Sequence, residues 1–151
     1  MANQVLTNPL GAFGRSTGNE VNFQVVVPFE AAAAITAGDL VAVAATVNTD
    51  TTITVEQFDV SDALPELVLG VAKNAAAAGA IVEVVVFGYA VCNIGSTSPA
   101  MGNIVIIGAS DGVAGVLAPA VAGTITGDNF GIFLGTEIGS TNTAAIWFSK
   151  F

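Results

Sequence analysis

The segment at residues 81–87 (IVEVVVF) constrains the fold most, because its side chains have the pattern of a β-strand that is apolar on both faces. The even positions are all valine, and the odd positions are apolar except for Glu83. We expect a strand of this kind to be buried on both sides. Glu83 then requires a charged partner or an edge open to solvent, because an unpaired buried carboxylate is unfavourable.

Other segments have the period of two that is typical of strands. Val21, Phe23 and Val25 alternate with polar residues, and residues 144–151 form a further apolar strand pattern. No segment has the sustained 3.6-residue period of an amphipathic helix, and glycines recur at short spacing. The sequence therefore predicts an all-β fold, a single β-sandwich or barrel-like domain, over residues 21–151.

Residues 51–60 form another predicted strand, because they are rich in β-branched side chains. Ile53 and Val55 share one face, but Phe58 and Val60 fall on the other. A β-bulge near residues 56–57 would account for this change of face.

Three segments in which a glycine precedes a strand indicate an internal repeat. They are residues 38–43 (GDLVAV), 79–84 (GAIVEV) and 102–107 (GNIVII). Glycine suits the positive φ that such turns often require. The pair Leu69–Gly70 recurs as Leu134–Gly135, so two related β-units at about residues 35–90 and 100–151 are predicted. Chance similarity in a chain rich in valine and glycine is the alternative.

The balance of apolar and charged residues points to packing against other proteins. Hydrophobic residues make up 53% of the chain and charged residues only 10%, so a monomer would expose wide apolar patches, which mark interfaces. The alternative is that alanine inflates the apolar count. The net charge is −9, and the basic residues are Arg15, Lys73 and Lys150. Without a basic patch we expect no binding to nucleic acid.

A membrane span is not expected either. The strongest candidate, residues 75–92, contains Glu83 and two glycines and is rich in valine, whereas a spanning helix needs about 20 apolar residues. The start of the chain also lacks the basic and apolar regions of a secretory signal peptide.

The residue types for catalysis are scarce. The chain has no histidine and one cysteine, Cys92, which removes the common general base, nucleophile pairs and zinc sites. We expect Cys92 to be a buried apolar residue. Asp111–Gly112 and residues 127–129 offer oxygen ligands for calcium without matching its loop pattern. The sequence therefore predicts a protein that is not an enzyme and has no cofactor.

Residues 1–20 have the composition of an extended arm. Turn-forming residues separate Val5, Leu6, Leu10 and Phe13, which show no periodicity. An unattached terminus is the alternative, but these apolar residues favour an arm that lies along another surface.

Three motifs occur in order in the first half of the chain: residues 37–43 (AGDLVAV), 68–72 (VLGVA) and 78–84 (AGAIVEV), with Gly88 after the last. In this order they resemble the head decoration or capsid cement proteins of tailed bacteriophages. The resemblance covers about residues 35–90, and residues 102–151 fit less closely.

That resemblance implies a small β-domain that binds the outer face of an assembled capsid in the virion, after assembly in the host cytoplasm. The implied partners are the major capsid protein and sister copies in a homotrimer. Leu10, Phe13 and Arg15 of the arm are then candidate capsid contacts.

Two other readings remain open from the sequence. One is another self-assembling structural protein, such as a fibre, tail or surface-layer subunit. The other is a carbohydrate-binding β-sandwich in which Tyr89 and Trp147 stack on sugars.

Overall fold

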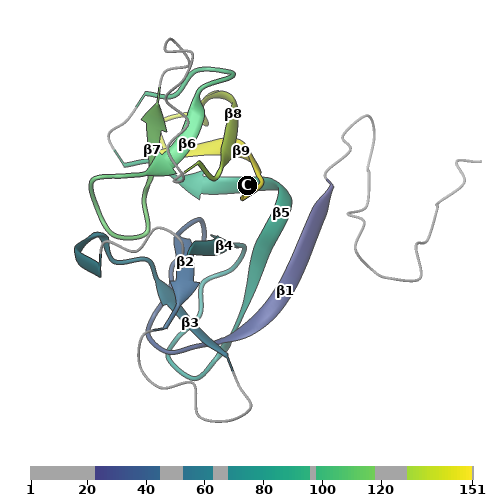
Figure 1. Cartoon of the computed structure of the whole chain (residues 1–151), viewed down its shortest axis with the longest axis vertical. Helices are drawn as coiled ribbons and strands as arrows, with labels where there is room; N and C mark the ends of the chain where they lie inside the picture. Colours follow the sequence, from purple (N-terminus) through teal and green to yellow (C-terminus); the bar gives the residue numbers. More distant parts are fainter. Residues whose placement is uncertain (1–22, 45–52, 63–67, 96–97, 118–128, 151) are drawn as a thin grey trace, which may run out of the picture.

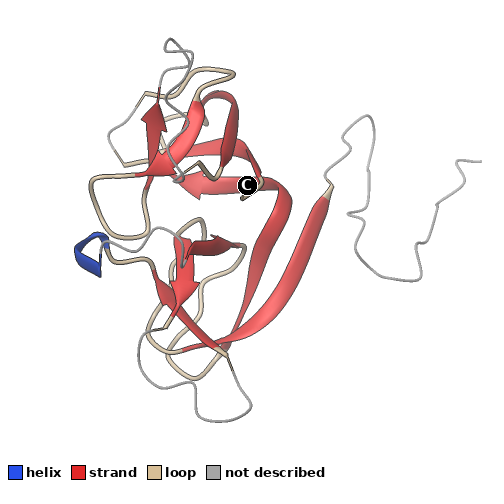
Figure 2. Cartoon of the chain, viewed as in Figure 1, coloured by secondary structure: helices blue, strands red, loops and turns tan. Residues whose placement is uncertain are grey.

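The computed structural model describes residues 23–44, 53–62, 68–95, 98–117 and 129–150, and over these residues the regular secondary structure is β-strand except for one short 3-10 helix (Figure 2). The predicted all-β fold is confirmed. The elements in chain order are β1 (Gln24–Ala31), β2 (Leu40–Val43), β3 (Thr54–Gln57), the 3-10 helix η1 (Val60–Asp62), β4 (Val68–Ala72), β5 (Ile81–Asn93), β6 (Ile104–Ile107), β7 (Ala114–Leu117), β8 (Gly131–Glu137) and β9 (Thr143–Phe148). The predicted arm at residues 1–20 lies outside the described residues.

Five of the strands close into a barrel, and the others extend from it (Figure 1). The strand order is β1-β3-β2-β4-β5-β9-β8-β6-β7, and β1 also pairs with β5, which closes the first five strands. All neighbouring pairs are antiparallel except β1 and β3. The predicted barrel-like domain is therefore confirmed.

β5 belongs to both parts, because its first half lies in the barrel and its second half pairs with β9. The strand bends at Gly88, which has a φ of +98°. A Cβ at this position would overlap the carbonyl oxygen of Phe23, so only glycine lets β1 approach the bend. The direction of the second sheet, β5-β9-β8-β6-β7, follows from this bend (Figure 1).

Two apolar cores hold the molecule together. The smaller core fills the barrel and includes Val41, Val55 and Val84. The larger core lies between the barrel wall and the second sheet, with Leu40 and Val71 on one side and Phe148 on the other. Burying each side chain of this size contributes about 1.5–3 kcal/mol, so the second sheet is fixed to the barrel by its inner face.

The turn glycines occupy the conformation that the sequence pattern predicts. Gly38, Gly79 and Gly102 have φ values of +90°, +76° and +83°, and each precedes a strand. In each turn the backbone N–H after the glycine donates to the carbonyl three residues earlier, at 3.2, 3.0 and 3.0 Å respectively. These are the turns in which glycine is favoured, so this prediction is confirmed.

The two halves of the chain have the same strand order. The first half has the order β3-β2-β4-β5 and the second has β7-β6-β8-β9, with antiparallel neighbours throughout. The predicted match between Leu69–Gly70 and Leu134–Gly135 is wrong, however. Gly70 lies opposite Val41 in the first half, and Gly131 lies opposite the corresponding Val105 in the second.

Gly70 and Gly131 share a physical requirement that Gly135 lacks. A Cβ on Gly70 would overlap the carbonyl oxygen of Val85, and a Cβ on Gly131 would overlap that of Trp147. Gly135 has open space around its Cα. The corresponding positions of the two halves are therefore those where two backbones approach closely, and Gly135 is not one of them. The internal repeat itself stays a prediction.

Two strand predictions need correction. Val82, Val84 and Val85 are buried, but Ile81 and Phe87 are exposed. On the outer side of β5 the larger core covers Val85 and leaves these two residues uncovered by the described part of the chain. Glu83 is exposed and forms an ion pair with Lys73 at 3.3 Å. The bulge near residues 56–57 is also absent, since β2 and β3 pair without a register shift and the strand ends at Gln57.

The close approach at Gly131 leads to a matched test. We expect Gly131→Ala to lower the free energy of unfolding by about 2–4 kcal/mol, through overlap with Trp147 and a strained φ of +141°. Gly135→Ala should be neutral or stabilise by about 0.4–1 kcal/mol. Urea denaturation of both variants measures the difference, and equal effects would contradict the structural equivalence of Gly70 and Gly131.

Candidate functional site

The outer surface of the second sheet is an apolar face that nothing in the described part of the chain covers. Its members project outward from three adjacent strands, and we call them the apolar face: Phe87, Tyr89 and Val91 of β5, Ala145 and Trp147 of β9, and Ile132 of β8. Tyr89, Trp147 and Ile132 lie opposite one another across the three strands. Phe87 is 41% exposed and Ile132 46% exposed.

An aromatic cluster forms one corner of the apolar face. The Phe23 ring stacks on Trp147 with centroids 6.2 Å apart. The Phe87 ring meets Trp147 edge-on at 5.7 Å and Phe23 edge-on at 5.8 Å. Such ring pairs are favoured by their quadrupoles, so the three rings support one another as one apolar cluster. Phe23 is also the first residue that the structure describes.

The apolar face carries no charge in a chain whose net charge is −9. The outward positions beyond it on β5 and β9 are the neutral Asn93 and Thr143. Charged residues are depleted at the centres of protein interfaces, where aromatic residues are enriched. The composition of this face is therefore that of a protein-binding surface.

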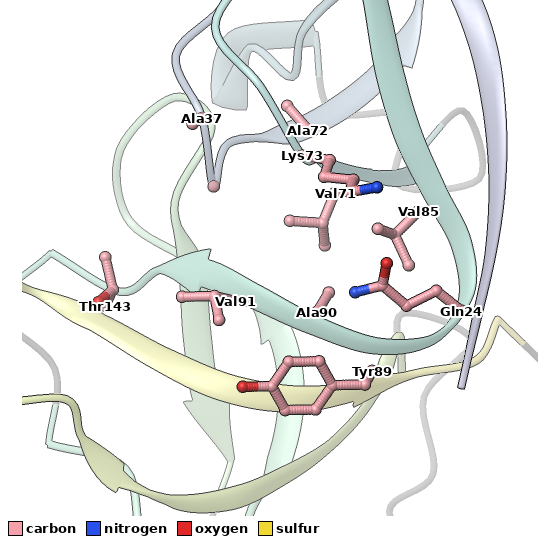
Figure 3. Close-up of a pocket in the computed structure, with 11 residues that line it drawn as sticks. Gln24, Ala37, Val71, Ala72, Lys73, Val85, Tyr89, Ala90, Val91 and Thr143 are labelled. Carbon is pink, nitrogen blue, oxygen red and sulfur yellow. The ribbon is translucent and has the colours of Figure 1, made fainter. Parts of the chain in front are cut away.

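A groove of about 360 Å³ adjoins the apolar face where the second sheet meets the barrel (Figure 3). Tyr89 and Val91 belong to both the face and the groove. The barrel side of the groove is formed in part by Val71 and Val85. The remaining lining residues are Gln24, Ala37, Gly38, Ala72, Lys73, Ala90 and Thr143.

Asp39 joins the two parts of the fold beside this groove. Its side chain is buried, with 3% of the residue exposed. One carboxylate oxygen accepts hydrogen bonds from the Thr36 backbone N–H at 2.9 Å and from Gln57 Nε2 at 3.0 Å. The other accepts from Asn93 Nδ2 at 2.7 Å. Asp39 therefore connects the turn before β2 with β3 and with the end of β5.

Burial and hydrogen bonding act in opposite directions on Asp39. Burial raises the pKa of its carboxyl above the ordinary 3.8, and the hydrogen bonds from Thr36, Asn93 and Gln57 lower it by less. The folded state therefore binds this proton more tightly than the unfolded state. Asp39 thus contributes stability at low pH that is lost as the pH rises through its folded pKa.

We expect Asp39→Ala to lower the free energy of unfolding by about 1–3 kcal/mol, because three donors lose their acceptor. Relative to Asp39→Asn, the wild type should gain stability as the pH falls from 7 towards 4. Denaturation across this pH range measures both effects.

Asp59→Asn is the control, because the stability of the wild type relative to this variant should change with pH in the opposite direction. The side-chain and backbone hydrogen bonds from Ser61 lower the pKa of Asp59. The wild type should therefore lose stability relative to Asp59→Asn as the pH falls. If the wild type gained stability at low pH relative to both Asp39→Asn and Asp59→Asn, or lost it relative to both, the opposite pKa shifts of the two carboxyls would be contradicted.

Cys92 and Asp111, which the sequence offered as candidates for chemistry, make contacts that stabilise the fold. Cys92 is buried, as predicted, and burial raises the pKa of its thiol to about 12. Asp111 Oδ1 accepts a hydrogen bond from the Val60 backbone N–H at 3.0 Å. Over the described ranges, no three or more His, Cys, Asp or Glu side chains gather as a metal site would require. Among the same residues, no helix is long and apolar enough to cross a membrane.

The sequence predictions and the structure differ on where a surface for partners lies. Leu10, Phe13 and Arg15 fall outside the described residues, so their role as capsid contacts stays a prediction. The apolar face as a whole was not predicted, because Phe87 was expected to be buried; only Tyr89 and Trp147 were considered as surface residues, in the carbohydrate-binding reading. The alternation of small and large residues along residues 87–92 is the signal that could have shown it.

Comparisons with known proteins identify a shared fold. No known family matches the chain, and no curated protein matches it. Among solved structures, the chain is similar to the N base of the head fiber gp8.5 of bacteriophage phi29, with a TM-score of 0.53 and 14% sequence identity. The similarity covers 85% of this chain and 96% of the other. At this identity the comparison shows that the two chains share a fold.

Proposed function

We propose that this chain is a structural protein of a bacteriophage virion that decorates the outer surface of the capsid. The uncharged apolar face is the observation that carries this proposal, because it is suited to packing against protein. The fold shared with a phage head-fiber base and the sequence motifs that resemble decoration proteins both support a place on the phage head.

The proposed mechanism is burial of surface without catalysis. A stable protein interface buries about 1,600 Å² in total, and the apolar face with its aromatic corner supplies the centre of such an interface. The major capsid protein is the proposed partner. Sister copies, as a homotrimer, are the second proposed partner, because repeated copies on a lattice bind with avidity.

A fiber subunit is the second candidate function. The specific observation in its favour is that the similar solved structure is the base of a head fiber. Electron microscopy of the purified chain separates the two. Filaments that form without capsids would favour the fiber subunit, and discrete particles that coat capsids would favour decoration.

The apolar face provides the first test of the proposal. We expect Phe87→Ser combined with Ile132→Ser to weaken binding to phage heads at least tenfold, because polar hydroxyls replace side chains at the centre of the interface. Co-sedimentation of the purified chain with heads of its phage measures the affinity.

Met101→Ser is the matched control for that test, because Met101 is 78% exposed and lies outside the apolar face. It should leave binding unchanged. Equal binding by the wild type and the double variant would remove the apolar face from the capsid interface. Absence of the chain from purified virions by mass spectrometry would reject the proposal itself.

The arm provides a separate test. Deleting residues 2–20 removes Leu10, Phe13 and Arg15 and should weaken binding to heads while leaving the fold intact, because the first strand of the barrel, β1, begins at Gln24. Leu10→Ser combined with Phe13→Ser should reproduce the loss, and Ser16→Ala combined with Thr17→Ala should not. Undiminished binding after the deletion would exclude the arm as a capsid contact.

A further inference from the structure

The groove beside the apolar face runs along the second half of β5 (Figure 3). Gln24 lies at one end, opposite Gly88, and Thr143 lies at the other, opposite Asn93. Gly88 and Asn93 are five positions apart on the strand, a separation of about 16 Å. The groove is therefore elongated, with a polar side chain at each end.

Between its ends the groove combines an aromatic ring with neutral polar groups. The Tyr89 ring lies along it, with the hydroxyl pointing away from Gln24 (Figure 3). The Gln24 side chain enters from β1, and its amide can both donate and accept hydrogen bonds. Within the described ranges, neither the Gln24 amide nor the Tyr89 hydroxyl has a hydrogen-bond partner. Both groups are therefore available to a ligand.

The charges at the groove compensate one another. Among the described residues that line it, only Lys73 is charged, and Lys73 is paired with Glu83 at 3.3 Å. The walls include the apolar side chains of Val71 and Val85. Small-molecule sites have mostly apolar walls, a few polar groups and volumes of about 300–1,000 Å³, and the groove has about 360 Å³. This composition favours a small ligand without net charge.

The backbone along the groove offers little to an added peptide strand. The Tyr89 N–H donates to the Phe23 carbonyl at 2.7 Å, and the Asn93 N–H donates to the Gly38 carbonyl at 2.8 Å. A peptide that adds to a sheet uses a row of unpaired backbone groups, and these two positions are already paired. Recognition in the groove therefore depends mainly on side chains.

We propose that this groove binds a neutral oligosaccharide. A sugar ring has an apolar face of C–H groups, which packs on an aromatic ring, and hydroxyls that donate and accept hydrogen bonds. Tyr89 supplies the ring, and Gln24 supplies the amide at one end. The Thr143 hydroxyl at the other end lies 2.7 Å from Thr141 Oγ1 and can form a further hydrogen bond.

This assignment separates the two aromatic residues that the sequence offered for stacking on sugars. Tyr89 lines the groove, whereas Trp147 is stacked with Phe23 and does not line it. A short chain of linked sugars, rather than one ring, matches the distance between Gln24 and Thr143. The inference goes beyond the proposed function and does not depend on it.

An NMR titration of the isolated chain, without capsids, tests this inference. The neutral probes are maltotriose, cellotriose and triacetylchitotriose, with trigalacturonate as the acidic probe and capped tetra-alanine as the peptide probe. We expect at least one neutral trisaccharide to shift the amides of Tyr89 and Val91 with a Kd of about 1 mM or tighter. Neither comparison probe should shift them.

Three variants locate the site. Tyr89→Ala removes the stacking surface and should weaken binding at least about tenfold. Gln24→Ala removes a hydrogen-bonding group and should weaken it about threefold or more, which also provides the test if Tyr89→Ala fails to fold. Phe87→Ala is the matched control, because Phe87 is an aromatic residue of the same strand that does not line the groove. It should leave the affinity unchanged.

Three outcomes would overturn the inference. The first is that none of the neutral trisaccharides shifts these amides. The second is that the folded Tyr89→Ala and Gln24→Ala variants bind as tightly as the wild type, which would put the sugar elsewhere. The third is a response to trigalacturonate or to tetra-alanine alone, which would assign the groove to an acidic ligand or to a peptide.

Discussion

The continuity of β5 through its bend at Gly88 is the constraint on which the rest of the structure depends. One strand of thirteen residues closes the barrel with its first half and begins the second sheet with its second half. The bend requires a φ of +98° and leaves no room for a Cβ beside Phe23. A residue with a side chain would separate β1 from β5 at the point where both parts of the fold meet.

The bend also explains why no other described part of the chain covers the apolar face. The inner face of the second sheet packs on the barrel wall through Phe148 and Ile146, and the barrel occupies that side alone. The alternate residues of the same strands, such as Trp147 and Ile132, therefore project away from both cores. The aromatic corner, the uncharged surface and the groove all follow from the bend of β5. For this reason we propose the second sheet as the binding surface.

Asp39 provides a polar connection where the apolar cores do not reach. Its carboxylate collects donors from Thr36, Gln57 and Asn93, which belong to a turn, to β3 and to the end of β5. Burying a charged group is unfavourable unless it is fully hydrogen-bonded. The three hydrogen bonds offset part of that cost, and the same turn positions Gly38, whose carbonyl accepts a hydrogen bond from Asn93 of β5 at the end of the groove.

The sequence by itself determined the fold class, the turn glycines and the burial of Cys92, because period, composition and positive φ are local properties. It could not separate Gly131 from Gly135 as the partner of Gly70, since only strand register shows which backbone approaches closely. It could not show that Phe87 is exposed while Val85 is buried. The sequence pattern of an apolar strand is the same whether or not a second layer covers it. Only the tertiary structure decides which faces of the strand are covered by that layer.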